Sequence, residues 1–181
     1  MIDTIYDSAE IAARAHHGQM RKDGVTPYIV HPGRVATLVA MMTHDYPTLD
    51  GVMAKHMIAA AWLHDVIEDT TTTEGELYRE VDAAIIDLVV GLTNDKSIKA
   101  PRPDRKKMER ERLEKASQAV RLIKLADRLD NVQDLEHLSD DFAKLYARET
   151  EELVFALTRG PMCMSGVRIS LAIGEAIKDF L

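Results

Sequence analysis

The sequence contains few cysteines, glycines and prolines, and each shortage excludes a class of protein. Cys163 is the only cysteine among 181 residues, so the chain can form neither an internal disulfide nor a CxxC zinc site. Any metal ion must therefore be bound by histidine and carboxylate side chains. The nine glycines and six prolines stand mostly at breaks between other segments, so we expect no long linker and no fibrous or disordered architecture.

The sequence also lacks long apolar runs and an excess of positive charge. The longest apolar stretches, residues 57–63 and, interrupted by Asp87, residues 83–92, fall far short of the ~20 residues that span a bilayer. The first ten residues carry three acids and no apolar segment of the signal-peptide kind, so we expect a cytoplasmic protein with no membrane partner. The net charge of −7 argues against a nucleic-acid partner, because such proteins use excess Lys and Arg to neutralise phosphates.

The abundant residues favour helices. Ala, Leu, Met, Glu, Lys and Arg dominate between the breaks, and apolar residues recur at three- and four-residue spacing without a sustained strand-like alternation. We therefore predict an all-α fold in which residues 1–181 form a single-domain bundle of about eight to ten helices. Pro47 and Gly160 mark breaks, and residues 94–104 form a loop. The predicted helices cover residues 3–17, 33–45, 50–68, 74–93, 105–115, 117–137, 139–159 and 163–180.

Residues 60–70 form the segment with the most chemical information, and their sequence is AAWLHDVIEDT. A continuous helix would place His64 one turn before Glu68, and Asp65 one turn before Asp69. Burying three carboxylates beside apolar neighbours is costly unless a cation compensates, and a divalent metal ion is the simplest compensation. In the alternative interpretation the helix end is solvated, and the Glu-Asp pair merely faces water.

Two further segments offer matching side chains. His31 follows a turn in residues 24–32, GVTPYIVHP. In residues 119–138, a helix that is apolar on one face, polar side chains recur at positions i, i+3, i+4 and i+7 and form a single stripe. If this stripe is buried, it indicates a site; the alternative is a cluster of charges paired at the surface. The stripe consists of Lys124, Asp127, Arg128 and Asn131.

The order of these residues resembles that of a known family. His31, the pair His64-Asp65, and then Asp127 are similar to the H…HD…D signature of HD-domain metal-dependent phosphohydrolases. The surrounding sequence resembles the hydrolase domain of RelA/SpoT-type enzymes. The resemblance is strongest to the stand-alone small alarmone hydrolases, which include the metazoan homologue of SpoT. The resemblance covers residues 8–138, and helices in 139–181 would complete the bundle. Its blocks are AxxAHHGQMRKDGVTPYIVHPGRVA, AAWLHDVIEDT, DLVVGLTND and IKLADRLDNVQDL.

The resemblance implies a metal centre and a catalytic pair. It makes one divalent ion per chain the cofactor, typically Mn²⁺, and two imidazoles with two carboxylates suit this or another first-row cation. Such an ion lowers the pKa of a bound water. The catalytic pair would be Glu68 and Asp69, which would position or deprotonate that water and assist protonation of the leaving group. The implied metal ligands are His31, His64, Asp65 and Asp127.

The resemblance also implies substrate contacts. Arg21 and Lys22 match a pair that contacts the nucleotide, with the Arg stacked on the base; read alone, the stretch RKDG is an exposed basic turn. Asn131 matches a residue on the ribose side of the substrate. Lys124 and Arg128 are candidate partners of a phosphate or of other protein groups.

Two features complicate this transfer. Asp130 stands where the family commonly has His, which adds negative charge near the expected ribose-phosphate region. Residues 102–115 carry seven basic and four acidic side chains, a local excess that suits either a pyrophosphate cradle or a solvated helix with i,i+4 pairs. We favour the solvated helix, with one or two of Arg105, Lys106 and Lys107 reaching the site.

The resemblance implies a Mn²⁺-dependent pyrophosphohydrolase. It would remove the 3′-pyrophosphate from guanosine tetra- or pentaphosphate, or from the adenosine analogues pApp, ppApp and pppApp. A second hypothesis is an HD phosphohydrolase acting on another nucleotide, either the 2′-phosphate of NADPH or a nucleoside monophosphate. A third is a metal-stabilised helical protein that binds a nucleotide or partner without turnover. In the first two hypotheses the partner is a small nucleotide, and the sequence leaves homo-oligomerisation open.

Overall fold

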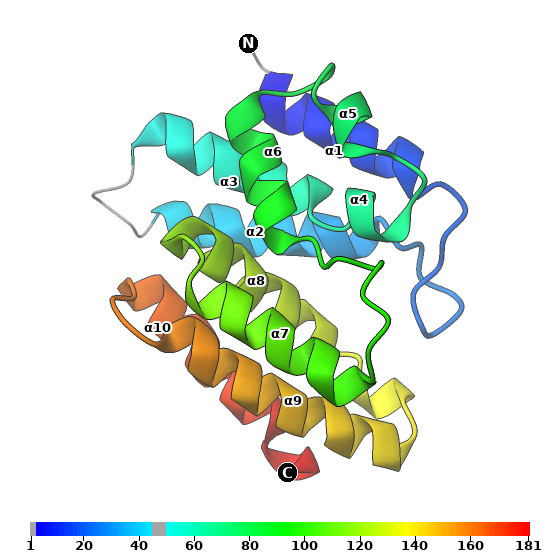
Figure 1. The fold of residues 1–181 in the computed structure, drawn as a ribbon, viewed down its shortest axis with the longest axis vertical. Helices are drawn as coiled ribbons and strands as arrows, with labels where there is room; N and C mark the ends of the chain where they lie inside the picture. Colours follow the sequence, from blue (N-terminus) through cyan, green and yellow to red (C-terminus); the bar gives the residue numbers. More distant parts are fainter. Residues whose placement is uncertain (1–2, 45–49) are drawn as a thin grey trace. The chain divides into compact units, whose positions relative to one another are not determined.

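The computed structural model describes residues 3–44 and 50–181, and this part of the chain is helical (Figure 1). It contains no β-strand; an isolated bridge joins Met20 and Pro27. The predicted all-α fold is thus confirmed. No helix in the described ranges has the length and apolar character needed to cross a membrane. The chain divides into two compact units, residues 1–96 and 97–181, and whether they act as the predicted single domain stays a prediction.

The central helix of the first unit is α3, which packs against α1, α2 and α6. Its buried face is rich in alanine, including Ala59, Ala60 and Ala61, and such small side chains let the neighbouring helices approach closely. The elements of this unit are α1 (Asp3–Ala15), α2 (Val30–His44), α3 (Gly51–Leu63), α4 (Val66–Asp69), α5 (Glu74–Leu77) and α6 (Ala83–Leu92).

The prediction of one helix over residues 50–68 is wrong. The helix α3 ends at Leu63, α4 begins at Val66, and His64 and Asp65 form the turn between them. The His64 ring explains part of this break, because its Nδ1 lies 2.8 Å from the carbonyl oxygen of Ala61 and occupies an acceptor near the helix end. The helix is therefore interrupted at these two residues, although the Asp69 N–H still bonds to the Asp65 carbonyl oxygen at 2.7 Å.

The prediction of one helix over residues 74–93 is also wrong, because α5 ends after a single turn. The start of α5 at Glu74 agrees with the predicted helix start. Thr73 and Glu76 form a capping box: the Thr73 hydroxyl accepts from the Glu76 N–H, and the Glu76 carboxylate accepts from the Thr73 N–H. At the start of α3, the Asp50 side chain is the N-cap. The break predicted at Pro47 and the helix end predicted at residue 45 lie outside the described residues.

The central helix of the second unit is α8, which packs against α7, α9 and α10. Its apolar face is buried and includes Leu122, Ile123 and Leu125, and the Ser117 hydroxyl caps its first turn. The predicted loop before this unit's first helix ends at Pro101, three residues earlier than expected. The elements are α7 (Arg102–Glu114), α8 (Gln118–Val132), η1 (Leu135–His137), α9 (Asp140–Thr158), α10 (Met164–Ile177) and η2 (Lys178–Phe180).

A buried acid joins α7 to α8. Glu109 is 5% exposed, with its Oε2 2.6 Å from Lys106 Nζ and its Oε1 3.7 Å from Lys124 Nζ. Burial raises the pKa of Glu109, but the ammonium groups of Lys124 and Lys106 outweigh this effect and lower the pKa to about 2. The helix α7, which was predicted to be solvated, is thus solvated on one side only, where Lys107 pairs loosely with Glu111.

We expect Glu109→Gln to lower the free energy of unfolding at neutral pH by about 3 kcal/mol, because it leaves buried ammonium charge uncompensated. The folded-state pKa of about 2 lies below the ordinary value of 4.5, so the carboxylate stabilises the fold above pH 4.5 and loses this effect as the pH falls towards 2. Urea unfolding at neutral and acidic pH should therefore show that the free energy of unfolding falls less with acid in the variant than in the wild type.

The control is Glu111→Gln, which removes an exposed partner of Lys107 and should change the free energy of unfolding by less than about 1 kcal/mol. Equal effects of the two variants would contradict the assignment of a buried ion pair to Glu109.

Candidate functional site

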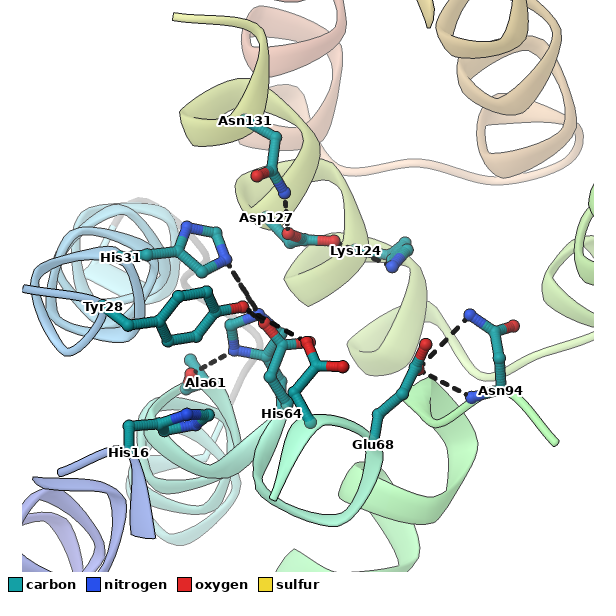
Figure 2. Close-up of polar contacts among 12 residues, drawn as sticks. His16, Tyr28, His31, Ala61, His64, Glu68, Asn94, Lys124, Asp127 and Asn131 are labelled. Carbon is teal, nitrogen blue, oxygen red and sulfur yellow. Dashed lines mark hydrogen bonds and ion pairs between the residues drawn. The ribbon is translucent and has the colours of Figure 1, made fainter. Parts of the chain in front are cut away.

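Three of the predicted metal ligands come together in the first unit (Figure 2). His31 lies in the first turn of α2, and His64 and Asp65 form the turn between α3 and α4. The two histidine Nε2 atoms are 3.2 Å apart. Asp65 Oδ2 lies 3.0 Å from His64 Nε2 and 3.5 Å from His31 Nε2. Both histidines are buried, so the three atoms form a compact, largely enclosed donor set.

The orientation of the His64 ring suits metal binding. Because the carbonyl oxygen of Ala61 can only accept, the Nδ1 atom that lies 2.8 Å from it must carry the proton. The Nε2 atom of the neutral ring then presents its lone pair towards His31 and Asp65. A backbone carbonyl that fixes one ring nitrogen and leaves the other for the ion is a common arrangement in metal sites. The donors, imidazole nitrogen and carboxylate oxygen, fit a divalent first-row ion.

Tyr28 belongs to this cluster and was missed by the sequence analysis. Its hydroxyl donates to Asp65 Oδ2 at 2.5 Å and lies 3.5 Å from Asp69 Oδ2. The edge of its ring packs against His31, with 5.6 Å between the ring centroids. The available signal was its position in PYIVHP, three residues before the histidine. Tyr28 thus holds the side chain of a predicted ligand in place.

The predicted catalytic pair lies on the short helix α4, and residues of the loop after α6 hold both carboxylates. Glu68 Oε2 accepts from the backbone N–H of Asn94 at 2.9 Å and from its side-chain amide at 3.4 Å. Lys96 Nζ lies 2.8 Å from Asp69 Oδ1 and also contacts the Glu68 carbonyl oxygen. Glu68 is half-buried and Asp69 is exposed, so the solvated alternative describes Asp69 alone. Sequence reasoning gave no role to Asn94 or Lys96.

The two histidines of the AHHGQ block differ in environment. His16 packs at the helix end near the site: it is buried, and its ring lies 4.7 Å from that of Tyr28. His17 is exposed and does not pack there.

The loop that carries the predicted nucleotide-binding pair has a defined shape. Asp23 Oδ1 accepts from the backbone N–H groups of Val25 and Thr26, and the Arg21 N–H donates to the Thr26 carbonyl oxygen at 2.8 Å. The Arg21 side chain is buried and Lys22 is exposed. The interpretation of RKDG as a wholly exposed turn is therefore wrong for Arg21. The nucleotide contacts of this pair stay a prediction.

The polar stripe on α8 in the second unit is buried. Asp127 is 4% and Lys124 9% exposed, so the alternative of a charge cluster at the surface is wrong. Lys124 Nζ lies 2.8 Å from Asp127 Oδ2, and the Asn131 amide donates to Asp127 Oδ1 (Figure 2). Burial lowers the pKa of Lys124, but Asp127 and Glu109 outweigh this effect and raise it. The stripe therefore holds an ordered carboxylate between an ammonium group and an amide.

Arg128, the fourth residue of this stripe, packs against α9. Its guanidinium carbon lies 4.6 Å from the centroid of the Tyr146 ring, and Nη1 donates to the Thr150 hydroxyl at 3.3 Å. Of the two roles predicted for this residue, these contacts favour the one in which it partners other protein groups.

Comparison with known proteins places this geometry in a family. An HD-domain family model matches residues 8–159 and so runs across both units. The human protein named guanosine-3′,5′-bis(diphosphate) 3′-pyrophosphohydrolase MESH1 is 38% identical over 138 residues, which are 76% of this chain and 72% of that protein. A Vibrio cholerae protein with the same enzymatic name is 37% identical over 158 residues, 84% of this chain but 21% of the much longer relative.

A solved structure gives the same result for the fold. A metazoan orthologue of SpoT, described as hydrolysing ppGpp, superposes with a TM-score of 0.80 at 28% sequence identity, covering 97% of this chain and 94% of that one. The chain therefore belongs to the HD-domain family, and it is homologous to the (p)ppGpp hydrolases of the MESH1 and SpoT type.

Proposed function

We propose that this chain is a metal-dependent pyrophosphohydrolase that removes the 3′-pyrophosphate from alarmone nucleotides, either guanosine tetra- and pentaphosphate or their adenosine analogues. The observation that carries the proposal is the donor set of His31, His64 and Asp65. The turn that carries its last two members leads directly into α4, which bears Glu68 and Asp69. The relatives reported above support the choice of substrate, because human MESH1 is named for this reaction.

The proposed metal ligands are the three side chains of the first unit and Asp127 of the second. The role of Asp127 rests on the order of the H…HD…D signature and on the family match that spans both units. Membership of the HD family implies a divalent ion. We propose one Mn²⁺ per chain, because two imidazoles and two carboxylates without a thiolate favour a borderline first-row cation.

The reaction breaks the bond between the nucleoside 3′-oxygen and the adjacent phosphorus. When bound, the ion would polarise the phosphoryl group and lower the pKa of a water molecule. The chain's own carboxylates, Glu68 and Asp69, would take the proton that this water loses and return it to the departing 3′-oxygen. Asn94 and Lys96 hold these carboxylates, and the Tyr28 hydroxyl orients Asp65, so the groups are positioned before the substrate arrives.

The remaining substrate contacts are proposed from the same resemblance. Arg21 would stack on the base while Lys22 contacts the nucleotide, and Asn131 would lie on the ribose side. Lys124 is kept charged by its neighbours and is a candidate for phosphate binding, whereas the contacts of Arg128 with α9 favour a role in packing.

A substrate panel tests the proposed reaction. We expect the purified protein with Mn²⁺ to release pyrophosphate from guanosine or adenosine alarmones, because the carboxylate pair and the donor set are both present, and ion-exchange chromatography would resolve the products. The same panel includes NADPH and nucleoside monophosphates. Phosphate release from these compounds without alarmone cleavage would establish the other phosphohydrolase activity, and nucleotide binding without any turnover would support the non-enzymatic alternative.

Two substitutions separate metal binding from proton transfer. Asp65→Ala should remove both the bound metal and turnover. Glu68→Ala should lower kcat by about 100-fold or more, since general acid–base groups contribute roughly 10²–10⁴-fold, while metal content measured by plasma mass spectrometry stays near that of the wild type. Asp87→Ala, which removes an exposed carboxylate on α6, is the control and should change neither. Loss of metal from Glu68→Ala would contradict the assigned roles.

The contact of Tyr28 with Asp65 makes a further prediction. Tyr28→Phe removes the hydroxyl that donates to Asp65 Oδ2 and keeps the ring. We expect it to weaken metal affinity by about 10-fold or more, because groups that orient a ligand typically contribute 10–100-fold. Titration of the metal-free protein with Mn²⁺ measures this affinity, and Tyr78→Phe, at an exposed tyrosine, is the control. Unchanged affinity in Tyr28→Phe would refute the role.

A further inference from the structure

The helix α4 depends on contacts from outside itself. It spans only Val66–Asp69, and one isolated helical turn is unstable in water because nucleation costs more than its few hydrogen bonds return. Its own bonds include Asp69 N–H to the Asp65 carbonyl oxygen at 2.7 Å. The carbonyl groups at its C-terminal end need donors from elsewhere. The direction in which this helix presents its two carboxylates is therefore set by other segments.

One such donor belongs to a hydrogen-bonded chain that begins at His16. Gln19 Nε2 donates to the backbone oxygen of Asp69 at 2.9 Å, and Gln19 Oε1 lies 2.8 Å from His16 Nδ1. Because the backbone oxygen can only accept, the amide nitrogen of Gln19 must face it, and the amide oxygen must face the ring. His16 Nδ1 consequently carries a proton, and the chain runs from His16 through Gln19 to Asp69.

The loop after α1 is shaped to make this chain. Gly18 adopts a φ of 78°, a conformation that glycine enters without the strain of a Cβ atom. This turn brings the Gln19 N–H to within 3.0 Å of the His16 carbonyl oxygen, so the two side chains lie on the same side of the turn. The neighbouring His17 is exposed and makes no hydrogen bond through its ring in the described structure.

Packing alone does not account for a histidine at position 16. Its side chain is 2% exposed, and its ring stacks against Tyr28 at 4.7 Å with 34° between the ring planes (Figure 2). Its Nε2 is buried, and no hydrogen-bond partner for this atom lies in the described part of the chain. Burying an unpaired ring nitrogen costs free energy that a phenyl ring would avoid. The gain that offsets this cost is the Nδ1 donor that orients Gln19.

We propose that His16 is a positioning residue, which holds the C-terminal end of α4 through Gln19 and thereby sets the direction of the Glu68-Asp69 pair. This inference rests on the proposed function, because it assigns a purpose to the orientation of that pair. His16 acts indirectly. Its hydrogen bond goes to Gln19, and Gln19 bonds to the backbone oxygen of Asp69 rather than to a reacting group.

The test uses three variants, a matched control and a rescue variant. His16→Phe keeps a ring against Tyr28 but removes the donor to Gln19. Gln19→Met removes the amide oxygen and the amide nitrogen at similar size and at a half-buried position. The double variant combines the two changes, and His17→Phe makes the same substitution at the exposed neighbour. His16→Asn is the rescue variant, because its amide N–H can take the place of Nδ1–H.

The first measurement needs no substrate. Amide hydrogen exchange of residues 66–70, compared with the rest of the chain, should be at least about fivefold faster in His16→Phe and Gln19→Met than in the wild type, since local opening follows the loss of anchoring bonds. The second measurement is steady-state kinetics on the Mn²⁺-loaded protein. His16→Phe and Gln19→Met should each lower kcat about 10-fold, as supporting contacts typically do, with KM changed by less than about twofold and metal content unchanged.

The pattern across the variants decides the proposal. The double variant should be no worse than either single variant, because both remove the same chain of contacts. His16→Asn should recover most of the wild-type exchange rate and kcat, and His17→Phe should match the wild type. If His16→Phe does not fold, Gln19→Met is judged by the same two measurements.

Three results would overturn the proposal: wild-type exchange of residues 66–70 in both single variants, faster exchange with an unchanged kcat, or effects that multiply in the double variant. Absence of turnover in the wild-type protein would instead refute the proposed function and with it the catalytic purpose of this chain. The exchange measurement would still decide whether His16 anchors α4.

Discussion

The structure of the first unit is organised around two imidazole nitrogens and a carboxylate oxygen that lie within 3.5 Å of one another. Bringing such electron-rich atoms together is favourable when a cation lies between them, and several neighbouring features serve this arrangement. The break between α3 and α4 allows His64 and Asp65 to turn towards His31. The Ala61 carbonyl selects the tautomer of His64, and the Tyr28 hydroxyl fixes Asp65.

Helix content and the signature residues were predictable from the sequence, because apolar spacing and the order of His and Asp are local properties. The break at His64 was not, because it depends on a ring that bonds to a carbonyl group, and the apolar spacing continues through it. Asn94 and Lys96 have no periodic pattern, so their contacts with α4 appear only once the chain is folded. Glu109 looked like one more charge on a solvated helix, since sequence alone does not show which side of α7 is buried.

The negative charge of the chain takes on a different meaning in the structure. Some of its acids do not face water but sit beside the chain's own cations: Glu109 beside Lys106 and Lys124, and Asp127 beside Lys124. These pairs hold the side chains in place more than they add net stability, because desolvation offsets much of the attraction between buried charges. A net charge of −7 is thus compatible with an anionic substrate, which would be recognised by a few placed groups and by the metal ion.

The separation of α4 from α3 has a consequence for how the sequence of such a protein can evolve. The turn proposed to bind the metal ion lies between α3 and α4, whereas the carboxylates proposed to be catalytic lie on α4 itself. Loop residues at positions 19, 94 and 96 anchor α4. Substitutions in those loops can therefore retune the reaction rate while the metal site keeps its geometry. A single long helix would couple the reaction rate to the geometry of the metal site. The short helix leaves the two separately adjustable.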